Sequence, residues 1–200
     1  LWPVHPGSMG RPYPGHRLAV LDAQGQPVAP GTMGELGVLR GSDPVFFLEY
    51  WKNPEATRNK FVGEWALTGD LAVEDERGYL WFMGRADDVI ISAGHRIGPN
   101  EIEGVIQRHP AVAMNAVVAS PDPLRGDIVK AFVKLRPGHA PSDDLKRELQ
   151  TFVKDNLARH EYPRQIEFID ELPLTTTGKI LRLELRQREL DRAASAPQPR

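Results

Sequence analysis

The chain has 200 residues, 40% of them hydrophobic, and its 27 acidic and 25 basic residues give a formal net charge of -2. This balance gives no electrostatic reason to expect a nucleic acid or an anionic membrane as a partner. The sequence has no cysteine, which excludes disulfides, thiolate metal sites and a cysteine nucleophile. We expect a cytoplasmic protein, and the absence of cysteine is compatible with a reducing compartment without proving it.

Residues 1–86 are predicted to be rich in β-structure. Apolar and aromatic runs bounded by turn residues predict strands at 18–21, 34–39 and 79–83. A short helix is expected at 55–61, because Pro54 suits a first helical position. The chain starts without Met amid Pro and Gly, which we interpret as the middle of a longer polypeptide. Side chains that would then lack neighbours, and expose apolar surface, are Trp51, Phe61 and Trp65.

The pattern changes near residues 84–88, after which strands and amphipathic helices alternate. Strands are predicted at 89–91, 114–119, 128–135 and 165–169. Helices are predicted at 100–108, with Asn100 as the N-cap, at 142–157, with Ser142 as the N-cap, and from the loop 175–179 to about 190. The fold class is therefore α+β: a β-rich piece (1–86), a compact α+β domain with a central sheet (87–190) and a disordered tail (191–200).

The segment Thr-Thr-Thr-Gly-Lys at 175–179 places a lysine after a glycine, between a strand and a helix. Such a lysine is a mobile charge that can reach an anion. It is not a phosphate-binding Walker A loop, because Pro173 stands where a glycine is needed and Ile180 where Ser or Thr is needed. The alternative is an exposed Lys179 that simply opens a helix.

Three other segments contain polar side chains beside glycine. In Thr-Gly-Asp at 68–70, a carboxylate at a strand end can accept hydrogen bonds from paired ribose hydroxyls, or Asp70 can be an ordinary turn residue. In Gly-Arg-Ala-Asp-Asp at 84–88, Arg85 can bind a sugar or phosphate, or the segment can be a salt-bridged linker. In Ser-Ala-Gly-His-Arg-Ile-Gly at 92–98, His95 lacks the partners of a general base and is better interpreted as a contact residue. The six histidines form no ligand cluster, so we expect no metal site built from protein ligands.

In this order, these segments resemble those of the adenylate-forming superfamily of acyl-CoA synthetases, adenylation domains and luciferases. The stretches at 93–103, 120–133 and 161–173 look most like the medium-chain acyl-CoA synthetases, near the acetyl-CoA synthetases. The resemblance covers nearly the whole chain to about Leu190. It implies a two-step reaction, in which a carboxylate attacks the α-phosphate of ATP and the CoA thiol then attacks the acyl-adenylate. ATP, with Mg2+ on its phosphates, CoA and a carboxylic acid are the implied substrates.

The resemblance also implies roles for individual residues. Lys179 would be catalytic in the first step and reach the carboxylate and the α-phosphate. The nucleotide would be held by Asp70 and Arg85 at the ribose, by Arg96 and by Lys179. Asp87 would be the hinge of a large rotation between the steps.

After the rotation, Ala93, Gly94 and His95 would face the active site beside the pantetheine of CoA. Basic or aromatic residues that match CoA contacts are Arg125, Lys154, Tyr162, Pro163 and Arg164. Lys154 has a plain alternative as part of a solvated helix face.

The family's phosphate loop and acyl pocket are not in this sequence, so the 200-residue chain alone is predicted to be inactive. Two alternatives remain open at this point. One is an adenylation domain that loads an acyl-carrier protein, which the CoA-like basic residues disfavour. The other is a non-catalytic nucleotide-binding module. The acid, its chain length and the oligomeric state do not follow from the sequence.

Overall fold

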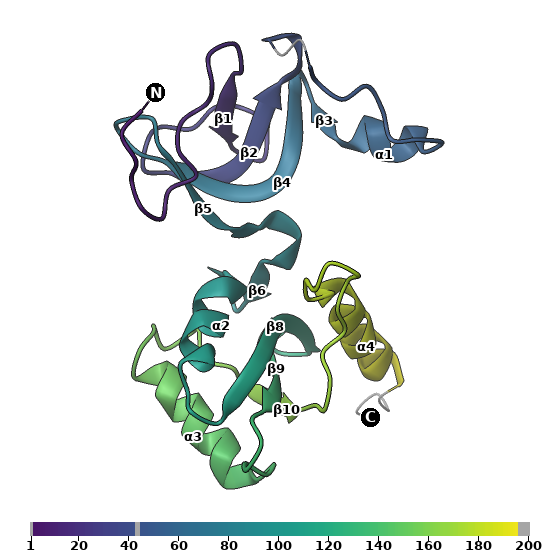
Figure 1. Cartoon of the computed structure of the whole chain (residues 1–200). Coiled ribbons are helices and arrows are strands. Elements are labelled where there is room, and N and C mark those ends of the chain that lie inside the picture. Colours follow the sequence, from purple (N-terminus) through teal and green to yellow (C-terminus); the bar gives the residue numbers. More distant parts are fainter. Residues whose placement is uncertain (1, 43–44, 196–200) are drawn as a thin grey trace. The chain divides into compact units, whose positions relative to one another are not determined.

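A computed structural model describes residues 2–42 and 45–195 (Figure 1). The contacts between residues divide the chain into two compact units, Leu1–Asp87 (unit 1) and Asp88–Arg200 (unit 2). Each unit has its own sheet, and helices occur in both, so the predicted α+β fold class is confirmed. No helix in the described part of the chain is long and apolar enough to cross a membrane.

Unit 1 is built on an antiparallel sheet in the order β1-β2-β4-β3, with β5 paired to β4. Its elements are β1 (Leu18–Leu21), β2 (Met33–Leu39), a 3-10 turn (Arg40–Ser42), α1 (Pro54–Asn59), β3 (Phe61–Val62), β4 (Trp65–Glu74), β5 (Leu80–Arg85) and a second 3-10 turn (Ala86–Asp88). Four buried apolar residues form its small core: Val20, Leu36, Ala72 and Leu80. The predicted strands at 18–21 and 34–39 are thus found, and the predicted helix at 55–61 ends two residues early.

Strand β4 differs from the prediction at Asp70. The carboxylate was expected at a strand end, but β4 runs on to Glu74. Gly69 has φ +82°, and the pairing of β4 with β5 shifts register between Leu71 and Ala72. A glycine at positive φ beside a bulge lets a strand bend and still continue its pairing.

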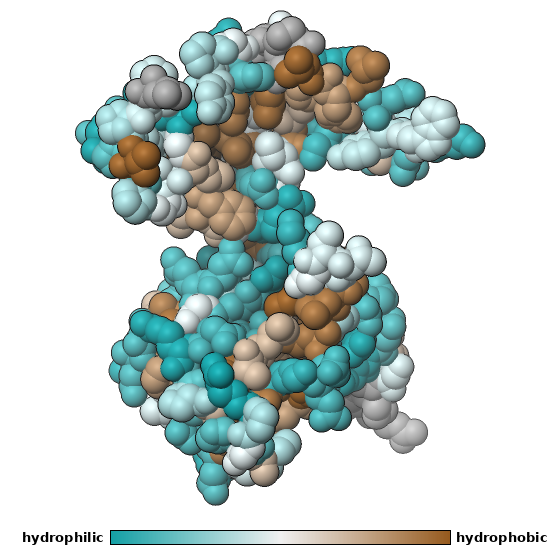
Figure 2. Space-filling model, viewed as in Figure 1, coloured by the Kyte–Doolittle hydropathy of each residue, from teal (hydrophilic) through white to brown (hydrophobic). Residues whose placement is uncertain are grey.

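Apolar side chains are exposed on unit 1, and Figure 2 shows hydrophobic side chains in brown among polar ones on the visible face of unit 1. Trp51 is 83% exposed, as expected. Phe61 and Trp65 are instead half-buried. Phe61 lies within an aromatic group with Phe46 and Phe47, which covers part of its ring.

Unit 2 is built on a mixed sheet in the order β10-β9-β6-β7, with β8 paired to β9. Its elements are β6 (Ile90–Ser92), β7 (His95–Ile97), α2 (Pro99–Gln107), β8 (Val112–Asp122), β9 (Gly126–Leu135), α3 (Asp143–Lys154), β10 (Gln165–Phe168) and α4 (Arg182–Ser195). Only β10 pairs in parallel among the described strands, and helix α3 supplies the crossover that a parallel pair requires.

The sheet of unit 2 has a core on each face. Alternate residues of a strand point to opposite faces, and β8 places Val117 in one cluster and Val118 in the other. The larger cluster lies under α2 and α3, while the smaller one, with Leu185, lies under α4. Figure 1 shows the same division, with α4 across the sheet from α2 and α3.

Strands β6 and β7 form a hairpin that the sequence analysis did not predict. Ser92 pairs with His95 across a two-residue turn. Ala93 and Gly94 have φ of +48° and +84°, the positive values that a type I′ hairpin turn requires at both positions. Alanine seldom adopts positive φ, so the residue types around this turn gave no hairpin signal.

Each of the three helices of unit 2 differs from the prediction at its start or its end. Gly98, not Asn100, is the N-cap of α2, and Pro99 occupies the first turn, where its missing N–H is not needed. Helix α3 ends at Lys154 instead of Leu157, and the Asn156 side-chain amide donates to the Phe152 carbonyl near this end.

Helix α4 continues to Ser195, so residues 191–195 are helical instead of part of a tail. An intrahelical hydrogen bond from the Gln187 side chain to Asp191 (2.8 Å) supports this last stretch. The rest of the predicted tail, residues 196–200, lies outside the described residues.

The predicted N-cap of α3 is confirmed, because the Ser142 hydroxyl accepts a hydrogen bond from the Leu145 amide at 3.1 Å. We expect Ser142→Ala to lower the free energy of unfolding of unit 2 by about 1 kcal/mol, since the amide would lose its acceptor. Hydrogen exchange of the α3 amides measures this loss. Ser142→Asp should keep the stability close to wild type, and an equal loss in both variants would contradict the capping role.

Candidate functional site

In unit 1, Asp70 and Arg85 lie directly opposite each other on β4 and β5. The Arg85 guanidinium donates to the Asp70 carboxylate (Nη1 to Oδ1, 2.9 Å), to the Thr68 carbonyl (3.3 Å) and to the Asp87 carboxylate (Nε to Oδ1, 3.1 Å). Burial alone would lower the pKa of Arg85, but the hydrogen bond to Asp70 and the attraction of both carboxylates raise it. The site is a partly exposed carboxylate whose orientation is fixed by a permanent cation.

Gly69 makes this arrangement possible. A Cβ at this position would lie 2.6 Å from Nη2 of Arg85, closer than side chains approach. The Gly69 amide donates to the Glu35 carboxylate at 3.1 Å, which ties the bend of β4 to β2. The short motif Thr-Gly-Asp therefore encodes a bend that admits the arginine.

In unit 2, the Lys179 segment is a tight, exposed turn before α4. The Thr175 amide donates to the Lys179 carbonyl (2.7 Å), and the Lys179 amide donates to the Thr175 hydroxyl (3.0 Å). Gly178 has φ +81°. Leu174 and Ile180 form a bridge that closes the turn. Among the described residues of unit 2, none pairs its carboxylate with the Lys179 side chain, so the ammonium is available to an anion.

The β6–β7 turn lies against the β8–β9 turn. The Ala93 amide donates to the Arg125 carbonyl at 3.0 Å, and Ser92 pairs with Gly126. The Arg125 side chain lies 4.0 Å from Asp122 (Nη1 to Oδ1). The structure thus brings together Ala93, Gly94 and His95, with Arg125 beside them.

A second cluster surrounds Tyr162. The Lys154 ammonium lies 4.1 Å from the centre of the Tyr162 ring, and the Arg164 guanidinium lies 5.2 Å from it and donates to the Tyr162 hydroxyl at 3.1 Å. Pro163 is buried below, and the Gln150 side chain donates to its carbonyl at 3.0 Å. Two cations beside one aromatic ring form a surface suited to a base with phosphates.

His160 joins the two clusters, and the sequence analysis missed it. The rings of His95 and His160 stack with their centres 4.3 Å apart and an angle of 16° between the planes, and both side chains are exposed. His160 precedes Tyr162 by two residues, so the stack places the hairpin turn against the segment that carries the cation cluster. No feature of the local sequence at His160 signals this contact.

Arg96 lies apart from the Tyr162 cluster contacts described above. It lies on β7 opposite Ile91, and its side chain is exposed. Among the described residues, no group of three or more His, Asp or Glu side chains is arranged to hold a metal ion.

The sequence analysis also missed an ion cluster where α4 begins. The Arg182 guanidinium binds Glu103 through two hydrogen bonds, of 3.0 and 2.6 Å, and lies 3.6 Å from Asp88. Arg186 binds the other oxygen of Asp88. The Glu103 carboxylate also accepts from the Val117 amide (2.8 Å), which links α2, α4 and β8.

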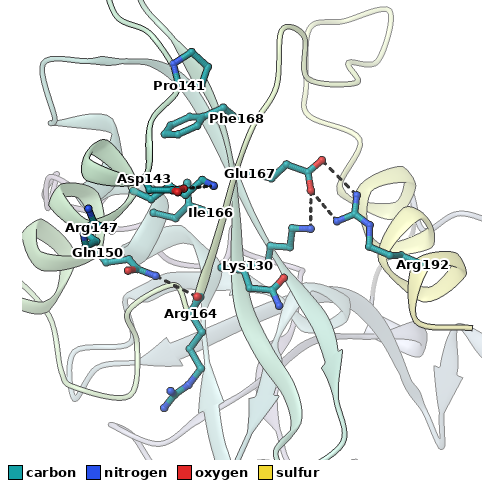
Figure 3. A pocket seen from close by; sticks show the side chains of 12 residues that line it. Lys130, Pro141, Asp143, Arg147, Gln150, Arg164, Ile166, Glu167, Phe168 and Arg192 are labelled. Atoms are coloured by element: carbon teal, nitrogen blue, oxygen red, sulfur yellow. Dashed lines mark hydrogen bonds and ion pairs between the residues drawn. The ribbon is translucent and has the colours of Figure 1, made fainter. Parts of the chain in front are cut away.

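A further ion network holds the other end of α4, and Figure 3 shows part of it. Lys130, which is 2% exposed, donates to Glu189 (2.7 Å) and Glu167 (2.8 Å). Arg192 also donates to Glu167 at 2.8 Å, and this bond, with that of Lys130, lowers the pKa of Glu167 to about 2 in spite of partial burial. Ser120 donates to Glu189 at 2.7 Å, so this buried carboxylate is satisfied.

Lys130 and Glu167 also line a pocket of about 710 Å³ between α3, β10 and α4, which Figure 3 displays. Neither Lys179 nor the β6–β7 hairpin lines it. This pocket therefore does not coincide with the predicted site, whose residues lie on exposed turns.

Comparison with known proteins gives one consistent family. Residues 101–179 match the model of the AMP-binding enzyme C-terminal domain. The chain is 48% identical over 189 residues to acetyl-coenzyme A synthetase of Bacillus subtilis (strain 168), with 94% of this chain and 33% of that protein covered. It is 46% identical over 190 residues to the mitochondrial acyl-coenzyme A synthetase ACSM3 of Rattus norvegicus, with 93% and 33% covered.

The fold agrees with these sequence matches. The chain superimposes with a TM-score of 0.82 and 39% identity on the anthranilate CoA ligase AuaEII in complex with anthranoyl-AMP, with 96% of this chain and 36% of that one covered. The predicted resemblance to adenylate-forming acyl-CoA synthetases is confirmed. The chain spans about a third of the length of the curated relatives that it matches.

Because Lys130 and Glu189 form a buried ion pair, removing the charge of one partner is predicted to lower stability sharply. We expect Lys130→Met to lower the free energy of unfolding of unit 2 by about 3–5 kcal/mol, because Glu189 would keep its buried charge and lose its closest cation. Denaturant-dependent hydrogen exchange of the β9 amides measures the change. Replacing both partners, Lys130→Met with Glu189→Leu, should recover most of the loss. Lys134→Met, which removes an exposed ion pair on the same strand, should change stability by less than about 1 kcal/mol.

Proposed function

We propose that this chain, which carries the AMP-binding enzyme C-terminal domain at residues 101–179, forms the C-terminal part of an AMP-forming acyl-CoA ligase. The complete enzyme would convert a carboxylic acid, ATP and CoA into acyl-CoA, AMP and pyrophosphate through an acyl-adenylate. Mg2+ would enter with ATP as part of the substrate complex, and no residue of this chain is assigned to hold it. A cytoplasmic location is part of the proposal. The single observation that carries it is Lys179, an exposed ammonium on a closed turn.

In the first half-reaction, the carboxylate must approach an α-phosphate that is also negative. The Lys179 ammonium would neutralise this repulsion and stabilise the charge that develops on the phosphate oxygens. Asp70 would accept hydrogen bonds from the ribose hydroxyls, because both oxygens of a carboxylate are acceptors. Arg85 would orient that carboxylate and contact the ribose, and Arg96 would approach the nucleotide phosphates.

In the second half-reaction, rotation about Asp87 would replace Lys179 with the turn at Ala93, Gly94 and His95. The exposed turn has little side-chain volume at its tip, which suits a narrow passage for pantetheine. The surface that continues through His160 to Tyr162 would bind the phosphorylated adenosine of CoA. Its cations are Arg125, Lys154 and Arg164.

Two alternatives predict different behaviour. An adenylation domain that loads a carrier protein would not need cations around Tyr162, because its acceptor thiol arrives on a protein. A non-catalytic nucleotide-binding module would not need an available Lys179. Both the Tyr162 cluster and the exposed lysine favour the acyl-CoA ligase.

The role of Lys179 is tested in the complete polypeptide that contains this chain. Lys179→Ala should slow acyl-adenylate formation, measured by ATP–pyrophosphate exchange, by a factor of about 10² to 10³. Thioester formation from supplied acyl-adenylate and CoA should persist, because Lys179 is not needed for thiol attack. Loss of both half-reactions to the same extent, or of neither, would overturn the assignment.

The CoA surface is tested separately. Arg164→Met should raise the KM for CoA by about tenfold, since one charge-assisted contact is lost, and leave ATP–pyrophosphate exchange unchanged. Arg147→Met, which removes an exposed i,i+3 ion pair on α3, is the matched control and should leave both steps unchanged. If Arg164→Met has no effect and a carrier protein is accepted in place of CoA, the carrier-loading alternative replaces this proposal.

A further inference from the structure

Helix α4 directly follows the Lys179 turn, yet it has little apolar attachment to the sheet. Of its 14 residues, Leu185 and Glu189 are the buried ones. The cluster beneath α4 contains five buried residues, against fifteen in the cluster under α2 and α3. Apolar burial is also non-directional, so Leu185 holds α4 against the sheet without fixing the direction of its axis.

Ion pairs fix the direction of the α4 axis, which the apolar contact leaves undetermined. At the start of α4, Arg182 and Arg186 bind Asp88, and Arg182 also binds Glu103. These side chains are half-buried or better, and Asp88 is 9% exposed. Because burial limits screening by solvent and salt, such pairs are stronger and more directional than surface pairs.

Asp88 has a special place in the chain. It is the first residue of unit 2, while its neighbour Asp87 ends unit 1 and accepts a hydrogen bond from Arg85. Asp88 itself is bound by Arg182 and Arg186 of unit 2. The proposed pivot at Asp87 would therefore adjoin a residue that is tied to α4.

The Lys179 turn depends on the placement of α4. Lys179 precedes Arg182 by three residues, and the bridge between Leu174 and Ile180 closes the turn just before the helix. The Leu181 amide donates to the Pro173 carbonyl (2.9 Å), so the turn and the helix start form one hydrogen-bonded piece. A shift of the start of α4 would therefore carry the lysine with it.

We propose that Arg182 and Arg186 are positioning residues for Lys179, and that they act by tying the start of α4 to Asp88. The ammonium then keeps a fixed place relative to the first residue beyond the pivot, and a rotation there moves it as part of one rigid body. This inference rests on the proposed role of Lys179 in acyl-adenylate formation.

The proposal predicts an unequal effect on the two half-reactions. The β6–β7 turn is held to the β8–β9 region by the Ala93–Arg125 hydrogen bond and the Ser92–Gly126 pairing. Loosening α4 should disturb the lysine and leave this turn in place. A purely structural role for the ion cluster would lower both half-reactions together.

The test uses Asp88→Asn, which keeps the side-chain volume, and Arg186→Met, which leaves the Arg182–Glu103 pair intact, in the complete polypeptide. Each should lower ATP–pyrophosphate exchange by about tenfold, because small displacements of a reacting group have large effects on rate. Thioester formation from supplied acyl-adenylate should stay within about twofold of wild type. The double variant should be no slower than Asp88→Asn alone, since Asp88→Asn already weakens the contact that Arg186→Met removes. Arg186→Lys should restore most of the exchange rate.

The matched control is Arg188→Met, which removes an exposed i,i+4 pair with Glu184 on the same helix and should change neither half-reaction. If Arg186→Met does not fold, Asp88→Asn carries the test. Equal losses in both half-reactions, additive losses in the double variant, or unchanged exchange would overturn the inference. If Lys179→Ala itself leaves exchange unchanged, the proposed function fails. If Lys179→Ala abolishes exchange and the cluster variants do not lower it, only the positioning role fails.

Discussion

The placement of one helix by ion pairs is the constraint on which the arrangement of unit 2 depends. Helix α4 covers the face of the sheet with the smaller apolar cluster, and charged residues hold it at both ends. Lys130 and Glu189 are each 2% exposed, a burial that charges tolerate only with complete pairing. On this face of the sheet, ion pairs therefore hold the helix in place, whereas apolar packing holds α2 and α3 on the other face. Because the turn with Lys179 is bonded to the start of α4, this ion network also positions that turn.

The turns assigned to the two proposed steps are held by different elements of unit 2. The Lys179 turn leads into α4, whereas the β6–β7 turn and the loop with Tyr162 are fixed through β9 and α3. In the proposed function, a rigid body that carries the two turns on different supports would present them one at a time.

The sequence predicted the elements whose signal is local. Apolar runs located β1 and β9, and the Ser142 cap with apolar spacing located α3. Interactions between distant residues had no such signal. Arg186 and Asp88 are 98 positions apart, and Arg182 and Glu103 are 79 apart. Their types are also ordinary for a solvated helix face. The β6–β7 hairpin was missed because its turn puts alanine at positive φ, and the His95–His160 stack because each residue is unremarkable alone.

The distribution of aromatic residues has a practical consequence for watching this molecule in solution. All four tryptophans, at 2, 51, 65 and 81, belong to unit 1. Unit 2 has none, and its single tyrosine is Tyr162, whose ring lies near the Lys154 and Arg164 cations. Tryptophan fluorescence, excited at the red edge of the absorption spectrum, therefore comes from unit 1 alone. The other half carries one phenol as its natural optical label, located in the surface where an adenosine would stack.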